Sequence, residues 1–224
     1  MELSEIYFSQ GAAVSLVLMG FVCLFGLQKS IGYSKALSIL SVLGLFALLL
    51  EYTSIHTGFP YGYFLYSNKL GFKLLDTVPW TVFLGWTPLV IGCVGLSERV
   101  SSSFWMRIFL STFFLVLIDL VFDPVAVALG FWSWIHPGAY FGVPAVNFLG
   151  WVFSGFFASF FTLQILKGRV LSPITIIPCL LLLCTSVVLA VIFHFWFPLC
   201  LGLSLLFLFV FLQSPFSKKI TNRW

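Results

Sequence analysis

The sequence predicts an all-α integral membrane protein whose fold is a polytopic helical bundle of about seven transmembrane helices. Of its 224 residues, 61% are hydrophobic and only 8% are charged, whereas a soluble domain carries about 25% charged residues. The apolar residues gather into long stretches, and a helix that crosses a membrane needs roughly 20 residues of this kind. Because no polar linker divides the chain, we expect residues 1–224 to form a single membrane domain.

Seven stretches of the chain are candidate membrane spans. They cover residues 8–27, 35–55, 78–97, 104–126, 144–166, 172–193 and 197–214. The first is preceded by Glu2 and Glu5 and by no basic residue, so it lacks the positive start of a cleaved signal peptide and is expected to be retained. The last is short and follows a break between His194 and Pro198, which leaves six or eight spans as alternatives.

The lysine and arginine residues predict the orientation of the bundle. Nine of the 11 lie in alternate loops or in the C-terminal tail, namely Lys29, Lys35, Arg99, Arg107, Lys167, Arg169, Lys218, Lys219 and Arg223. The positive-inside rule places this side in the cytoplasm, with the N-terminus outside and the C-terminus inside. We therefore expect the chain in the cytoplasmic (inner) membrane. The net charge of +4 reflects this topology and gives no reason to expect a nucleic-acid partner.

Several other groups have structural interpretations. Asp76 is expected to cap the third span, and Glu98 is expected to be a cytoplasmic surface charge beside Arg99. The five cysteines fall inside predicted spans and form no Cys-x-x-Cys motif. We therefore expect these cysteines to be reduced and to pack as small hydrophobic side chains.

One nine-residue segment occurs twice in related form. Val78–Trp86 and Val143–Trp151 agree at six of nine positions, and each begins a helix with a proline in its first turn. Each follows a helix with an acid near its outer end, Glu51 in the first case and Asp119 and Asp123 in the second. We predict two helix pairs of the same sense, spans 2–3 and 4–5, that face each other across a cavity. Chance similarity of two helix starts is the alternative.

Three acids are expected at the same depth in the outer half of the membrane. Asp119 and Asp123 lie one helical turn apart on one face, and Glu51 comes from another helix. Acids are costly inside hydrocarbon, so they are functional candidates by default. Structural roles are the alternative: Asp123 precedes Pro124 and can end its helix, and Asp119 can pair with Asn147. We assign Glu51, Asp119 and Asp123 as candidate catalytic residues.

Aromatic and polar residues of two loops, 56–77 and 128–143, and of the helix starts that follow them are expected at the same end of the bundle. Such convergence is typical of a ligand site, although tryptophan and tyrosine also anchor proteins at membrane interfaces. The candidate substrate-binding residues are His56, Pro60, Tyr61, Tyr63, Tyr66, Trp80, Trp86, Trp132, Trp134, His136, Tyr140, Asn147 and Trp151.

These residue types favour acid–base chemistry on an apolar substrate. A poorly hydrated carboxyl group can stay protonated and give its proton to an alkene, while a second carboxylate holds a water molecule. Aromatic faces stabilise a nearby carbocation by roughly 0.5–2 kcal/mol each. His56 and His136 with a carboxylate are the alternative, a single metal site, but their spacing matches no strong pattern, and we expect no metal. The sequence contains no dinucleotide, P-loop or nucleophile-elbow motif.

Five motifs between Glu51 and Trp151 resemble one known family. They are Glu51 at a helix end, Gly58–Tyr66, Asp123-Pro124, Gly130–Trp134 and Tyr140–Trp151. In this order they resemble the membrane carotenoid-biosynthesis proteins, the family that includes carotenoid hydratases of the bisanhydrobacterioruberin hydratase and gamma-carotene 1'-hydroxylase type. The second motif departs from the family pattern at two positions, with Tyr61 in place of phenylalanine and Phe64 in place of tyrosine.

The resemblance implies addition of water across the terminal double bond of a linear carotenoid, with no redox cofactor and with membrane lipid as the surroundings. Our hypothesis is that Asp119 or Asp123 protonates the alkene, and that Glu51 or the other aspartate, with Asn147, holds the water. Trp132, Trp134 and Tyr140 would shield the cation, in a site near the outer leaflet. The alternatives are a proton-coupled membrane transporter and a non-catalytic lipid-binding or assembly protein.

Overall fold

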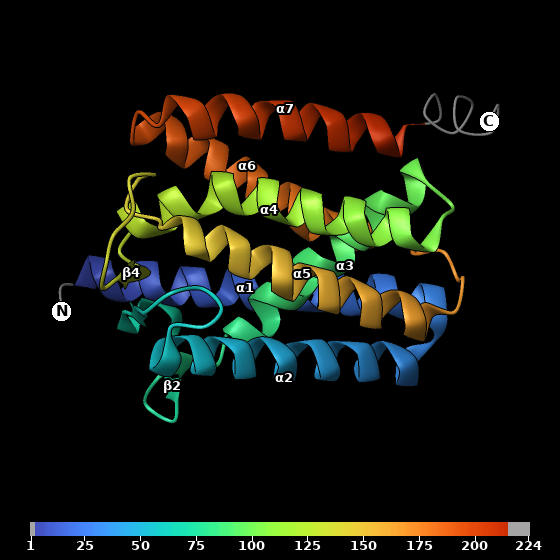
Figure 1. Ribbon diagram of the computed structural model, residues 1–224, viewed down its shortest axis with the longest axis horizontal. Helices are drawn as coiled ribbons and strands as arrows, with labels where there is room; N and C mark the ends of the chain where they lie inside the picture. The colour runs from blue at the N-terminus through green and yellow to red at the C-terminus, as the bar shows by residue number, and fades with distance from the viewer. Residues whose placement is uncertain (1–2, 215–224) are drawn as a thin grey trace.

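The protein is a bundle of long helices that run along one common direction (Figure 1). The computed structural model describes residues 3–214, and the side chains from residue 11 onward. Its helices are α1 (Leu3–Ile31), α2 (Tyr33–Thr57), α3 (Val82–Val100), α4 (Phe104–Ala128), α5 (Ala145–Leu166), α6 (Ile177–Ile192) and α7 (Trp196–Gln213). This confirms the predicted all-α polytopic bundle.

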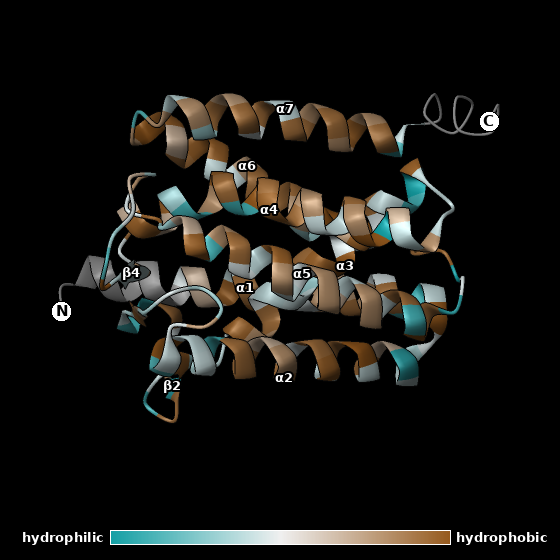
Figure 2. Cartoon of the chain, in the orientation of Figure 1, coloured by the Kyte–Doolittle hydropathy of each residue, from teal (hydrophilic) through white to brown (hydrophobic). Residues whose placement is uncertain are grey.

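Six of these helices are long and apolar enough to cross a membrane, and α3 is not among them. Hydrophobic residues dominate the helices, and polar residues gather toward their ends (Figure 2). The α3 helix packs against α1, α2, α4, α5 and α6, and its residues from Trp86 to Ser97 are all buried. A helix enclosed by other helices meets little lipid, so it tolerates glycine, proline and polar residues that a lipid-facing helix would not.

The two ends of the bundle differ in character. The loops after α2 and α4 lie at the end where the described chain begins, and the short connections α1–α2, α3–α4 and α5–α6 lie at the other (Figure 1). Of the nine basic residues assigned to the cytoplasm, six belong to this second end, and Lys218, Lys219 and Arg223 lie outside the described residues. The orientation of the bundle in a membrane stays a prediction.

Short strands, which the sequence did not lead us to expect, order the first end. They are β1 (Phe64–Tyr66), β2 (Lys73–Leu74), β3 (Val78–Pro79) and β4 (Trp132–Trp134), with a 3-10 helix at Asn68–Leu70. A second 3-10 helix, Pro173–Ile176, lies in the α5–α6 connection at the other end. The β1 strand pairs with β4 in antiparallel register, with Leu65 opposite Ser133. The loop after α2 is therefore joined directly to the loop after α4.

The two related segments of the sequence meet in space. Trp86 on α3 and Trp151 on α5 occupy equivalent positions of the segments, and their rings stack with centroids 5.9 Å apart and planes 22° apart. Together with the β1–β4 pairing, this shows that the helix pairs α2–α3 and α4–α5 face each other. Their common ancestry stays a prediction.

Two local expectations, and one of the alternative structural roles, are wrong. Asp76 does not cap a helix, because it lies in the turn between β2 and β3 with a φ of 56°, while α3 begins six residues later, at Val82. Glu98 is not a surface charge, because its side chain is 1% exposed, accepts the backbone N–H of Leu171 at 2.8 Å and lies 3.9 Å from Arg107. Asp123 does not end a helix, because α4 continues to Ala128. The five cysteines are free, as predicted, but only Cys23, Cys93 and Cys179 pack in the interior, while Cys184 and Cys200 are exposed.

Candidate active site

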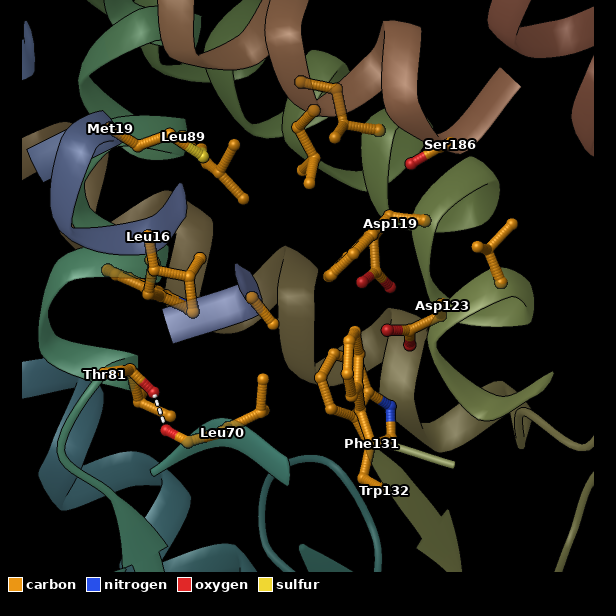
Figure 3. A pocket seen from close by; sticks show the side chains of 18 of the residues that line it. Leu16, Met19, Leu70, Thr81, Leu89, Asp119, Asp123, Phe131, Trp132 and Ser186 are labelled. Carbon is orange, nitrogen blue, oxygen red and sulfur yellow. Dashed lines mark hydrogen bonds between the residues drawn. The ribbon is translucent and has the colours of Figure 1, made fainter. Parts of the chain in front are cut away.

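A chamber of about 710 Å³ lies within the bundle near the end that carries the β-strands. Its volume falls within the roughly 300–1,000 Å³ that small-molecule sites occupy. Ten of the predicted site residues line it: Glu51, Tyr61, Tyr66, Trp86, Asp119, Asp123, Trp132, Trp134, Asn147 and Trp151. In Figure 3, Asp119 and Asp123 point from α4 into this space, above Phe131 and Trp132, and Leu16, Met19 and Leu89 form the opposite wall.

Asp119 and Asp123 are held together by one amide. The Nδ2 group of Asn147 donates to Oδ2 of Asp119 at 3.0 Å and to Oδ2 of Asp123 at 2.6 Å. All three side chains are 3% exposed, and the other oxygen of Asp119, Oδ1, is buried without a hydrogen-bond partner within residues 3–214. A buried carboxyl oxygen without a partner is uncommon in native proteins, so this oxygen marks the acid pair as a candidate functional group.

Glu51 faces the same chamber from α2. Its side chain is 6% exposed, and its Oε2 accepts the hydroxyl of Tyr66 at 3.0 Å. Burial raises the pKa of Tyr66 well above its ordinary value, and the charge of Glu51 raises it further, so the phenol keeps its proton and donates it in this hydrogen bond. In the described part of the chain, the hydrogen-bond partners of the three acids are therefore neutral groups.

The loop after α2 is fixed against the chamber by Ser54. The Ser54 hydroxyl donates to the carbonyl of Gly62 at 2.9 Å and accepts the N–H of Tyr61 at 3.0 Å. The indole N–H of Trp134 donates to the carbonyl of Tyr61 at 2.9 Å, which ties this loop to β4. These bonds hold Tyr61 against the α5 helix at Gly150, where an added Cβ would lie 2.6 Å from the carbonyl oxygen of Pro60.

Replacing Gly150 by alanine should destabilise this junction, because the new methyl group would lie 2.6 Å and 2.9 Å from the carbonyl oxygen and carbon of Pro60, which are backbone atoms. Overpacking of this kind costs about 1–3 kcal/mol, and the expected result is a lower melting temperature of the purified protein. Gly11→Ala is the matched control, because a Cβ there meets nothing within 4 Å. Equal melting temperatures for the two variants would contradict the packing described here.

Pro124 leaves a gap in the hydrogen bonding of α4 beside the acids, and Tyr140 fills it. Proline has no N–H, so Leu120, four residues earlier, loses its helical partner. The Tyr140 hydroxyl donates to the Leu120 carbonyl at 2.6 Å. Burial raises the pKa of Tyr140, and Asp119 and Asp123 add to the effect, so the phenol remains a donor. This bond steadies the turn that separates Asp119 from Asp123.

Tyr140→Phe should leave the Leu120 carbonyl unpaired and lower the free energy of unfolding by about 1 kcal/mol. The measurement is chemical or thermal unfolding in detergent. Tyr63→Phe removes the same atom from an exposed tyrosine in the neighbouring loop and should change stability little. If both variants unfold alike, the Tyr140 hydroxyl has no part in supporting α4.

Six predicted substrate-binding residues do not line the chamber, namely His56, Pro60, Tyr63, Trp80, His136 and Tyr140. His56 is exposed and bonds to the carbonyl of Tyr52, Trp80 stacks on Phe72, and His136 is exposed in the loop before α5. Within residues 3–214, no group of three or more His, Cys, Asp or Glu side chains is arranged to hold a metal ion.

The chamber also has walls that sequence reasoning did not identify. Residues of α1 and α6 line it, and several of these are exposed on the outside of the bundle: Gly11, Ser15, Leu18, Leu181 and Thr185. Leu18 is 58% exposed and Leu181 is 51% exposed. The chamber therefore opens sideways between α1 and α6, on the flank that a bilayer would cover. The residues at this opening are small or aliphatic, like many others in the spans, so the sequence does not mark it.

Comparison with known proteins gives the family. The sequence model of the carotenoid biosynthesis protein family matches residues 11–209, which is most of the chain. The chain belongs to this family. The chain is 37% identical over 121 residues to the bisanhydrobacterioruberin hydratase of Haloarcula japonica. The match covers 52% of this chain and 41% of that relative, so the chain spans under half of the relative's length. No solved structure matches the chain.

Proposed function

We propose that this carotenoid biosynthesis protein is a hydratase, which adds water across the terminal double bond of a linear carotenoid and gives a tertiary alcohol. The observation that supports this most directly is the chamber, where carboxyl groups from two helices share one apolar, aromatic space and bond to neutral partners. The name of the Haloarcula japonica relative supports the same class of reaction.

The Asp119–Asp123 pair gives the proton in this proposal. Two carboxylates one helical turn apart repel each other, so the pair favours a state that holds a proton. Asn147 orients both groups through a single amide. Transfer of the proton forms a C–H bond at the less substituted carbon of the alkene and leaves a tertiary carbocation at its neighbour.

Aromatic rings and Glu51 complete the addition. Trp132 packs edge-on against Tyr66 and Phe122 at centroid distances of 5.7 and 5.6 Å, beside the acids, and each ring face contributes roughly 0.5–2 kcal/mol toward a nearby cation. Water then forms the C–O bond and releases a proton to Glu51, whose carboxylate is steadied by Tyr66. Return of this proton from Glu51 to the aspartate pair restores the starting state. The sum is then one water added, and the reaction needs no oxidant or reductant.

The opening between α1 and α6 suits the shape of the substrate. A linear carotenoid is a long apolar chain that dissolves in the bilayer, and only its end group reacts. An opening lined by Leu18 and Leu181 lets that end enter the chamber while the rest of the chain stays in lipid. The reacting end then meets the acids without crossing the polar surface of the protein.

The direct test is expression of the full chain in membranes that contain a linear carotenoid, in isotopically labelled water. The expected product is heavier by one water and carries the labelled oxygen. Label taken from molecular oxygen would point to an oxygenase. An unchanged carotenoid, with correctly folded protein present, would favour the transporter or the lipid-binding protein as the alternative function.

A further inference from the structure

One hydroxyl on the wall of the chamber is not used by the protein itself. The serine and threonine residues that line the chamber are Ser15, Thr81, Thr185 and Ser186. The hydroxyls of the first three donate to backbone carbonyls, at 2.8, 2.6 and 2.9 Å. The hydroxyl of Ser186 makes no hydrogen bond within residues 3–214. Its proton and its lone pairs are therefore free for a ligand.

Ser186 is buried and points into the chamber. It is 2% exposed, and Figure 3 shows its oxygen directed from α6 into the space that Asp119 also faces. The α4 and α6 helices pack against each other, so these two side chains come from neighbouring helices. A serine inside a helix can bond to the carbonyl four residues earlier, and the large majority of buried polar side-chain atoms have a partner. The unused hydroxyl of Ser186 departs from both patterns.

The chamber has room for a small polar molecule beside Ser186. Its volume is about 710 Å³, whereas a water molecule takes up about 30 Å³ in the liquid. A bound water therefore leaves most of the space to the end group of a substrate. A hydroxyl can donate its proton to the oxygen of water, and the second lone pair of that oxygen then stays free to attack. Water is also the small polar substrate that a hydratase must bind.

The position of Ser186 next to the acid pair meets a geometric demand of hydration. The proton and the water add to neighbouring carbons of one double bond, so both must be held within reach of the same end group. Asp119 and Ser186 point into the same space (Figure 3). A carboxylate only accepts hydrogen bonds, so it can bind a proton of water but cannot donate to its oxygen. Ser186 supplies that donor.

Glu51 supplies the acceptor that the same water needs. It lines the same chamber, and Tyr66 bonds to only one of its two carboxyl oxygens. The other oxygen can accept a proton of water. A buried water is held by several polar groups at once, and a hydroxyl donor together with a carboxylate acceptor fixes both its oxygen and one of its protons.

We propose that the Ser186 hydroxyl binds the oxygen of the water molecule that attacks the carbocation. The inference rests on the proposed hydration. The Asp119–Asp123 pair makes the C–H bond. The water on Ser186 then makes the C–O bond, and the O–H bond that breaks gives its proton to Glu51. Ser186 orients the nucleophile and exchanges no proton with the carotenoid.

The test measures how the carbocation is partitioned. In deuterated water, a cation that water does not capture returns a proton to the acid pair, and the carotenoid comes back carrying deuterium or with a shifted double bond. Ser186→Ala removes the hydroxyl and leaves the acids in place. Because one hydrogen bond to the nucleophile is lost, we expect the ratio of deuterated or isomerised carotenoid to alcohol to rise about fivefold.

Ser159→Ala is the matched control, because Ser159 is another buried serine without a partner in the described part of the chain but does not line the chamber. It should keep the wild-type ratio. The ratio is internal to one sample, so it does not depend on how much protein folds. If Ser186 served the acids instead of the water, deuterium uptake and alcohol would fall together. An unchanged ratio in Ser186→Ala, at any level of turnover, would therefore overturn the water site. A wild-type chain that forms no alcohol would overturn the proposed function instead.

Discussion

Asp123→Asn should reduce hydration of a linear carotenoid by about 10²-fold or more while the protein stays folded. A positioned general acid contributes typically 10²–10⁴-fold to a rate, and the amide has no proton acidic enough to give to an alkene. The substitution keeps the shape of the side chain and an oxygen that accepts from Asn147. The measurement is turnover with a linear carotenoid, with melting temperature as the test of folding.

The controls for this result are Asp→Asn substitutions at other positions of the chain. Asp76→Asn alters an exposed acid in the turn between β2 and β3, and its turnover should equal that of the wild type. The turnover of the Asp119→Asn variant should fall as far as that of Asp123→Asn. The double variant should be little worse than either, because two groups that share one proton act as a unit. Full activity in both single variants would remove the pair from the mechanism.

The second large effect is expected at the opening between α1 and α6. Ser15→Trp and Thr185→Trp each place a large ring at an exposed residue that lines the chamber. Forcing a long substrate past such a ring should cost about 1–3 kcal/mol, which corresponds to a roughly fivefold to hundredfold loss of kcat/KM. A short isoprenoid with the same terminal alkene should lose less, because it can enter without bending around the ring.

Two variants separate this steric effect from damage to the helices. Val14→Trp and Val188→Trp place the same ring on α1 and α6 at residues that are 57% and 59% exposed and do not line the chamber. Both should retain wild-type kcat/KM. If all four tryptophan variants turn over the long carotenoid equally well, the substrate reaches the acids by another route.

The sequence predicted the acid cluster because two simple rules fix it. Helical periodicity places Asp119 and Asp123 on one face of α4, and the alternation of loops between the two ends of the bundle places Asn147 near the same end. Neither rule applies to loops. His136 follows β4, whose pairing with β1 depends on contacts between residues about 70 positions apart in the chain.

Burial of polar groups was harder to predict from the sequence. Glu98 stands next to Arg99 in the sequence, but its partners are Arg107 and the backbone of Leu171, which tertiary packing brings to it. Ser154 carries no motif and is one of many serines. Its spacing from Asn147 and Trp151 was the available signal, and only the structure shows that it is fully buried.

The face-to-face arrangement of the two helix pairs has a consequence for biosynthesis. The first pair, α2–α3, supplies Glu51, Tyr61 and Trp86, while Asp119 and Asp123 follow only with the second. A nascent chain that has inserted three helices thus holds an acid and several hydrogen-bonding groups with no chamber around them. Such groups are costly in lipid. The polar groups of the first half become buried only after α4 and α5 have been synthesised and inserted. Completion of the site therefore depends on the order of insertion.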